Sequence, residues 1–277
     1  MDDPVRLTQY CRSAGCGCKI APSILEEILS FAGTVAHSDR LLVGNDSRDD
    51  AAVFDLGNGQ AIVSTTDFFM PIVDDPFDFG QIASVNAISD VYAMGGKPLM
   101  AIAVLGWPTD KLPPGVAACV LEGGRAGCAC AGIPLAGGHS IDSPEPIFGL
   151  AVTGQVAVEN LKRNDRAVPG CELFLTKPLG VGLVATAQKR GLADQADFER
   201  AVKQMIKLNS LGALLGSQSG VKAMTDVSGF GLLGHPTEMC EGSGVSATRD
   251  SARGPPLEHL ARHIDAGSPS RGPGPTP

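Results

Sequence analysis

The chain has 277 residues, of which 43% are hydrophobic, 19% are charged and 5% are aromatic, a composition that excludes general disorder. Thirty acidic residues outnumber 22 basic ones, so the formal charge is −8. The negative electrostatic field of such a chain opposes broad binding of nucleic acid. The longest apolar run, residues 98–107, is half of the roughly 20 residues that a membrane span needs, so no membrane-spanning segment is expected.

Periodicity in the first half of the chain predicts alternating helices and strands. A helix is expected to open at Pro22, and strands over 51–54 and 60–66 are expected to form a hairpin around the Gly-Asn-Gly turn at 57–59. Five further elements follow in order: a helix over 81–94, a strand over 99–105, a helix over 116–131 and strands over 133–136 and 148–156.

The second half is predicted to begin after a charged linker at 159–166. Strands are expected over 172–176 and 223–227, with one helix through Arg190 and a longer helix over 197–215. Pro236 is expected to shorten or kink a later helix. We therefore divide the chain into residues 1–158, 159–265 and an aberrant tail at 266–277, whose four Pro and three Gly residues are not compatible with a packed element.

The sequence GCGCK at 15–19 is the first candidate for chemistry. Lys19 favours the thiolate form of a neighbouring cysteine, and thiolate is the nucleophilic form. An ordinary loop with incidental thiols and a zinc site are the alternatives, although the spacing of the other cysteines does not fit zinc. The start of the chain carries no secretion signal, so the eight cysteines indicate reduced thiols in the cytoplasm.

Carboxylates at the ends of predicted elements form the second candidate. They are Asp46, Asp49, Asp50, Asp67, Asp90 and Asp226. Such oxygens suit Mg²⁺, which proteins typically hold with one or two carboxylates and the phosphates of a substrate. Asn86 and Asp90 lie one turn apart on an otherwise apolar helix. The alternatives are a solvated helix face for that pair and a surface turn for Asp49 and Asp50.

The third candidate is GGHS at 137–140, where glycines after a strand are able to present backbone N–H groups to a phosphate. Neither this segment nor the glycines at 229–234 match a P-loop or a complete dinucleotide fingerprint. His235, His259 and His263 suggest a metal cluster, but the spacing of a zinc protease is missing.

Taken together, these segments closely resemble the selenophosphate synthetases over about residues 8–265. The motifs that carry the resemblance are GCGCK at 15–19, NDSRDDAA at 45–52, STTDFF at 64–69, NAISDVYAMGGKP at 86–98, GGHSID at 137–142 and TDVSGFG at 225–231. That family lies in the superfamily of aminoimidazole ribonucleotide synthetase. The resemblance implies a two-domain α/β (α+β) fold, a homodimer through the N-terminal sheets, and a phosphotransferase that makes selenophosphate, AMP and phosphate from ATP, selenide and water.

The resemblance also implies roles for individual residues. It makes Cys16 and Lys19 catalytic, on a mobile loop at about 8–20, and Asp50, Asp90 and Asp226 ligands of magnesium. The expected nucleotide contacts are Lys19, Ser47, Arg48, Asp49, Asp67, Asp90, Gly138, His139 and Ser140, the last three reaching the nucleotide of the other subunit. Mg²⁺ is the implied cofactor and ATP the substrate, while a requirement for K⁺, a selenium-delivery protein and the role of Cys18 stay open.

Two other hypotheses remain beside this one. Another ATP-using enzyme of the superfamily, such as a thiamine-phosphate kinase, would explain the aspartates but not the 15–19 loop. The resemblance also thins from about residue 251, which suggests an incomplete C-terminal domain. A shortened chain that dimerises and binds nucleotide without turnover is therefore the non-enzymatic alternative.

Overall fold

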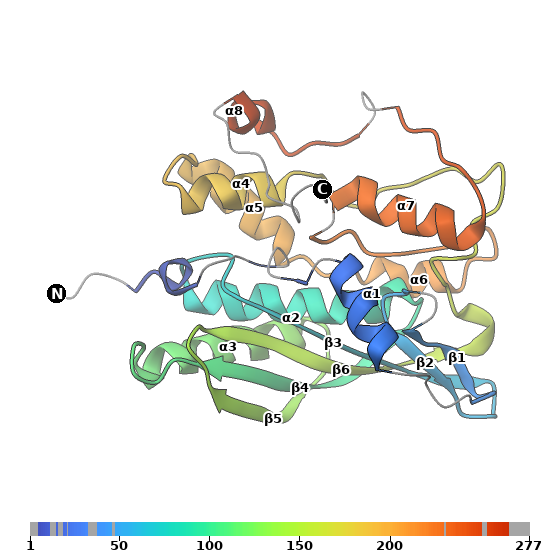
Figure 1. Ribbon diagram of the computed structural model, residues 1–277, viewed down its shortest axis with the longest axis horizontal. Coiled ribbons are helices and arrows are strands. Elements are labelled where there is room, and N and C mark those ends of the chain that lie inside the picture. Colours follow the sequence, from blue (N-terminus) through green and yellow to red (C-terminus); the bar gives the residue numbers. More distant parts are fainter. Residues whose placement is uncertain are drawn as a thin grey trace.

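The computed structural model describes residues 5–11, 15, 19–20, 22–32, 38–45, 48–229, 231–250 and 254–265. In this part of the chain the strands form one six-stranded sheet, with the order β1-β2-β3-β6-β4-β5 (Figure 1). The strands are β1 (Leu41–Val43), β2 (Ala52–Asp55), β3 (Gln60–Phe69), β4 (Lys97–Trp107), β5 (Leu135–Asp142) and β6 (Ile147–Ala157). All neighbours are antiparallel except β4 and β5.

The predicted hairpin is confirmed, with β2 and β3 paired from Ala52 opposite Ser64 to Asp55 opposite Ala61. Its turn needs glycine, because Gly57 and Gly59 have φ values of +79° and +83°. In β3, buried and more exposed side chains alternate, as expected for a strand with one covered face.

Helices α2 (Pro76–Ala93) and α3 (Pro114–Cys130) cover one face of the sheet. Asp75 caps α2 by accepting a hydrogen bond from Asp78 N at 2.9 Å, and Pro76 occupies the first turn. The two helices approach closely because a Cβ atom at Gly80 or Gly123 would lie 1.9 Å from a backbone oxygen of the other helix. Phe79 and Phe148 meet in this core with ring centroids 6.3 Å apart.

The opposite face of the sheet is open in this chain and carries large apolar side chains. Phe54, Phe68, Met100 and Ile102 are 39–46% exposed. The strand register places all four on this face, because they lie in the cross-strand rows of four alternate residues of β3, which are Ile62, Ser64, Thr66 and Phe68. Contiguous apolar surface of this kind marks an interaction site.

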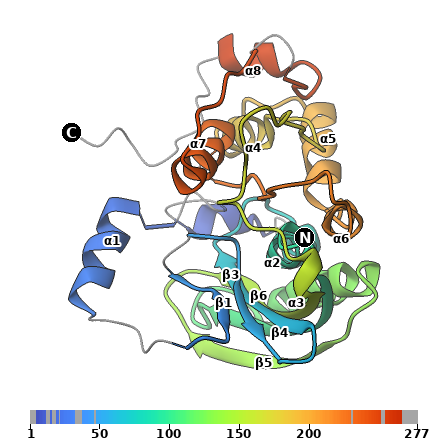
Figure 2. The same cartoon turned by 90° about the vertical axis from the view of Figure 1, so that its right-hand side faces the viewer.

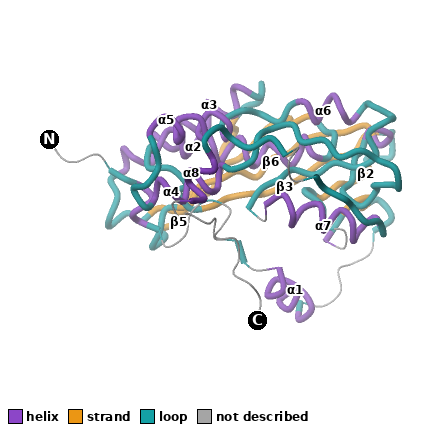
Figure 3. The backbone as a smooth tube through the Cα atoms, turned by 90° about the horizontal axis from the view of Figure 1, so that it is seen from above, coloured by secondary structure: helices purple, strands orange, loops and turns teal. Residues whose placement is uncertain are grey.

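The remaining helices lie on the other side of α2, so that α2 is between the sheet and the second half of the chain (Figure 2). They are α4 (Val181–Lys189), α5 (Gln195–Met205), α6 (Leu211–Gly216), α7 (Gly231–Ser243) and α8 (Leu260–Asp265). Two short 3-10 helices lie at Leu7–Tyr10 and Val158–Asn160. Helix α1 (Pro22–Phe31), predicted from Pro22, stands beside these layers (Figure 3).

Several sequence-based predictions for the second half are wrong. Residues 172–176 form no strand, and residues 223–227 make only an isolated bridge through Ala223 and Arg163. A strand needs a hydrogen-bonded neighbour, and no described segment provides one along either stretch. The predicted helix over 197–215 is two helices, since residues 206–210 interrupt it.

Two details of the second half were not evident from the sequence. The predicted linker at 159–166 is packed into the fold, because Lys162 and Asn164 are 8% and 3% exposed. Pro236 was expected to shorten or kink its helix, and α7 continues through it to Ser243, so the proline does not shorten it. One residue later, Thr237 Oγ1 donates to Leu233 O at 2.8 Å. None of the helices in the described ranges is long and apolar enough to span a bilayer.

Candidate active site

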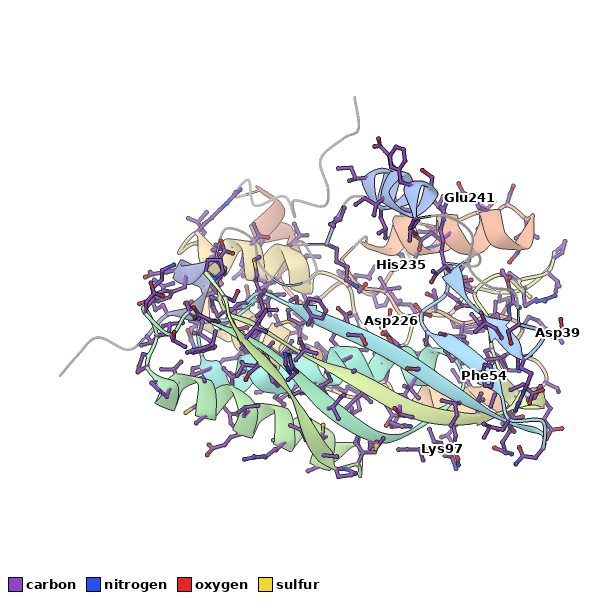
Figure 4. All side chains as sticks on the ribbon, turned by 60° about the horizontal axis from the view of Figure 1, so that its bottom comes forward. Asp39, Phe54, Lys97, Asp226, His235 and Glu241 are labelled. Atoms are coloured by element: carbon purple, nitrogen blue, oxygen red, sulfur yellow. The ribbon has the colours of Figure 1, made fainter. Side chains whose placement is uncertain are left out.

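Four carboxylates from four separate segments meet where the sheet, α2 and the second half of the chain come together. Asp50 precedes β2, Asp67 lies in β3, Asp90 lies in α2, and Asp226 precedes α7. Each of Asp50, Asp67 and Asp226 is close enough to Asp90 for its charge to raise the pKa of that group. Figure 4 shows Asp226 on the side of the sheet that faces α7.

The periodicity of β3 and α2 explains why their polar side chains lie at the carboxylate cluster. Alternation along β3 turns Thr65 and Asp67 to the covered face of the sheet. In α2, Asn86, Ser89 and Asp90 lie three and four residues apart and therefore share one face. Thr65 Oγ1 donates to Asp90 Oδ2 at 2.6 Å, and Asn86 Nδ2 donates to Asp67 Oδ2 at 2.7 Å.

Contacts across the sequence hold the other two carboxylates. Thr225 Oγ1 donates to Asp50 Oδ1 at 3.2 Å, which joins the loop before β2 to the loop before α7. Ser89 hydrogen-bonds the carboxylate of Asp226, and Asn209 Nδ2 donates to Ser89 Oγ at 2.7 Å. The second half of the chain is thus fixed to α2 through polar groups at the site itself.

The crowding of negative groups changes their protonation. Burial, followed by the charges of Asp226, Asp50 and Asp67, raises the pKa of Asp90 well above its ordinary value. Burial and the charges of Asp226 and Asp49 do the same to the pKa of Asp50. Burial also raises the pKa of Asp226, against the hydrogen bond from Ser89, which lowers it.

Asp49 anchors the adjacent loop. Its Oδ1 accepts from Asp50 N at 3.0 Å and its Oδ2 accepts from Asn164 N at 3.2 Å. Asn164 Nδ2 donates to Arg48 O at 3.1 Å, so the buried Asn164 hydrogen-bonds both Arg48 and Asp49 and holds this loop in place. Burial is the main reason why the pKa of Asp49 rises to about 6.

Lys19 places a positive charge at the edge of the cluster. Its Nζ lies 3.2 Å from Asp67 Oδ2, across 48 residues of sequence. Lys19 and Asp67, which were both predicted to contact the nucleotide, are therefore in direct contact with each other. Cys16 and Ser47, predicted to be catalytic and ATP-contacting respectively, lie outside the described residues.

The cluster fits a cation that brings further ligands with it. Asp50 Oδ2 is enclosed and has no hydrogen-bond partner, which leaves a buried acceptor available. Among the described residues, no three acidic, thiol or imidazole groups are placed to hold an ion by themselves. Mg²⁺ matches both observations, because it typically takes one or two carboxylates and completes its shell with phosphate oxygens and water.

The structure does not bring Gly138, His139 and Ser140 to this cluster. We expected a loop, but these residues are part of β5, because the backbone pairs with β4 from Leu135 to Asp142. In the sheet β5 is three strands from β3, a spacing of about 14 Å at about 4.8 Å per strand. His139 pairs with Val104, so it lies on the open face of the sheet.

Sequence reasoning missed several neutral residues of the site: Thr65, Ser89, Asn164, Asn209, Thr225 and His235. Burial inside otherwise apolar elements was an available signal for Thr65 and Ser89, which share a face with Asp67 and Asp90. The three histidines that the sequence offered as a metal cluster do not come together. His259 and His263 both contact Asp197, whereas His235 contacts Ser228.

The family of the chain follows from comparison with known proteins. Residues 48–156 match the AIR synthase related protein N-terminal domain, and residues 168–267 match the C-terminal domain of the same family. Over 267 residues the chain is 60% identical to the selenide, water dikinase of Photorhabdus laumondii, covering 96% of this chain and 77% of the relative. The chain belongs to the selenide, water dikinase family.

Solved structures agree with this family at the level of the fold. Thiamine monophosphate kinase from Aquifex aeolicus is 17% identical, with a TM-score of 0.70 over 88% of this chain and 80% of that one. The hydrogenase maturation protein HypE in complex with ATP is 21% identical, with a TM-score of 0.61 over 84% and 70%. The predicted α/β fold class with AIR synthase-like domains is thereby confirmed for this selenide, water dikinase family member.

Proposed function

We propose that this chain catalyses phosphoryl transfer from ATP to selenide, with water as the second acceptor, giving selenophosphate, AMP and phosphate. The observation that carries the proposal is the convergence of Asp50, Asp67, Asp90 and Asp226 on one place. Burial and neighbouring carboxylates raise the pKa of Asp50, Asp90 and Asp226, so the cluster is retained at a cost in stability, which is expected where a cation complexed with a phosphate binds.

In this proposal Asp50, Asp90 and Asp226 hold Mg²⁺, which when bound neutralises phosphate charge. Lys19 and Arg48 offset further negative charge on the transferred phosphoryl group. Lys19 Nζ is kept at the site by Asp67 Oδ2 at 3.2 Å, and Asn164 fastens the loop of Arg48 and Asp49. Cys16, three residues before Lys19, delivers selenium to the phosphorus. Ser47 completes the nucleotide contacts.

A second copy of the chain completes the site. The exposed apolar side chains of Phe54, Phe68, Met100 and Ile102 on one face support pairing of two sheets face to face. His139 lies on the same open face, so this pairing places it in the interface, and the contact of Gly138, His139 and Ser140 with the partner's nucleotide is proposed from the family resemblance alone. In this arrangement residues 1–158 supply both nucleotide binding and the dimer interface, and residues 159–265 supply Asp226.

The test is anaerobic phosphorus NMR of the full chain with Mg²⁺ and ATP, with and without selenide, beside Cys16→Ala. We expect selenide-dependent selenophosphate, AMP and phosphate from the unaltered chain and none from the variant. AMP and selenophosphate from Cys16→Ala would contradict the role of that thiol. A folded protein that binds ATP but releases no AMP would support the non-enzymatic alternative.

The same assay tests whether the reaction needs a monovalent cation or a selenium-delivery protein. Replacing K⁺ by Na⁺ tests for a monovalent cation, and comparing free selenide with a protein-bound selenium source tests for a delivery protein. We assign the reaction to the cytoplasm, where reduced thiols such as Cys16 persist.

A further inference from the structure

His235 is a buried histidine that contacts the loop carrying Asp226. It lies in the first turns of α7 and is 6% exposed. Its Nε2 is 3.1 Å from Ser228 N and 3.5 Å from Ser228 Oγ, while its Nδ1 is 3.5 Å from Glu238 Oε2. Figure 4 shows His235 and Asp226 on neighbouring segments at the same side of the sheet.

These contacts define the tautomer of the ring. A backbone N–H is always a donor, so Ser228 N requires a lone pair on His235 Nε2. The proton of the neutral ring is then on Nδ1, which lies 3.5 Å from the carboxylate of Glu238. A ring protonated on Nε2 would place one N–H against another and lose the Ser228 contact.

The loop between Asp226 and α7 needs such an anchor. Gly229 and Gly231 leave its backbone with wide conformational freedom, and Gly231 has φ of +71°. Before Asp226, Thr225 is fixed to Asp50, and at Asp226 itself Ser89 provides a hydrogen bond. After Asp226, Ser228 N is fixed by His235, and Ser228 O accepts from Gly231 N at 3.1 Å.

We propose that His235 is a positioning residue for the cation site: the lone pair of its Nε2 holds Ser228 N and thereby sets the position of the Asp226 carboxylate. The inference rests on the proposed function, since it takes Asp226 as a ligand of Mg²⁺. Residues that orient a metal ligand typically change metal affinity by about 10- to 100-fold when they are replaced.

The test compares two replacements of His235. His235→Gln keeps an acceptor oxygen near the place of Nε2, whereas His235→Leu fills similar space without one. The measurement is the Mg²⁺ concentration at half-maximal ATP binding, by calorimetry without selenide, together with thermal unfolding in EDTA. We expect the midpoint to rise at least about 10-fold for Leu and less than about 3-fold for Gln.

Two further variants separate the possible outcomes. His263→Gln changes another buried histidine, which contacts Asp197 rather than the site, and its Mg²⁺ midpoint is expected to stay unchanged. Asp226→Asn tests the metal site itself, and an unchanged midpoint would contradict the proposed function. A large effect of Asp226→Asn with none of His235→Leu, or equal effects of Leu and Gln, would overturn the role of His235 alone.

A measurement on the unaltered chain covers the case in which His235→Leu does not fold. Nitrogen-15 NMR of the labelled histidines at pH 7 distinguishes a protonated from an unprotonated Nε2. We expect His235 to have the proton on Nδ1 and the lone pair on Nε2. A proton on Nε2 would overturn the inference, whatever the variants do.

Discussion

Replacing Asp49 by Asn is expected to stabilise the metal-free protein at neutral pH. Burial raises the pKa of Asp49 from 3.8 to about 6, so the folded chain binds this proton more tightly than the unfolded chain does. Stability therefore falls as the pH rises from about 4 through 6, and Asn removes this loss.

The size of the effect follows from the two pKa values. A change from 3.8 to about 6 corresponds to about 3 kcal/mol, at about 1.4 kcal/mol per pH unit. Asn retains one side-chain oxygen to accept from Asp50 N or Asn164 N, and any change in these hydrogen bonds is independent of pH. The quantity to compare is therefore how the stability difference between variant and unaltered chain changes with pH.

The assay is urea unfolding in EDTA at pH values from 4 to 8, followed by circular dichroism. We expect the free energy of unfolding of Asp49→Asn, relative to the unaltered chain, to rise by about 2–3 kcal/mol between pH 4 and pH 8. A difference that is flat with pH, or that falls toward pH 8, would refute burial of the Asp49 charge as a destabilising factor.

Three other perturbations test separate parts of the molecule. Gly123→Ala should lower the free energy of unfolding by more than about 3 kcal/mol, because the added Cβ would lie 1.9 Å from Phe77 O. Gly115 lies in the same helix with open space around it, so Gly115→Ala should raise the free energy of unfolding by up to about 1 kcal/mol. Equal urea midpoints for the two variants would contradict this packing. Asp197→Asn should cost on the order of 2 kcal/mol at pH 7. Since hydrogen bonds from His263, His259 and Arg200 lower the pKa of Asp197 from 3.8, that cost should shrink as the pH falls below about 4, and a constant cost from pH 7 to 3 would count against the ion pairs. Ile102→Glu should dissociate the proposed dimer in sedimentation experiments while leaving the fold intact, and an unchanged mass would exclude the open face as its interface.

Local signals predicted the first half of the fold well. The Gly-Asn-Gly turn and the alternation after it gave the β2–β3 hairpin, because both the turn and the burial pattern are encoded within a few residues. Helix α2 begins at Pro76, earlier than the predicted residue 81. It is buried on most sides, so its hydrophobic pattern marked the start less clearly than the Asp75 cap and Pro76 do.

Long-range contacts account for what the sequence did not reveal. Residues 172–176 and 223–227 have strand-like composition, yet a strand exists only where a neighbour pairs with it. At the site, the motifs identified the charged members, whereas Asn164 and His235 act through hydrogen bonds to segments that the sequence alone does not place.

The alternation of β3 has a consequence for how this protein tolerates genetic change. Asp67 faces the carboxylate cluster, and the next residue, Phe68, faces outward on the opposite side of the sheet. Deleting one residue between Gln60 and Thr66 would exchange the two, removing a carboxylate from the cluster and burying an aromatic ring against α2. Substitutions are therefore able to alter the chemistry and the outer surface separately, whereas a single insertion or deletion in this strand alters both together.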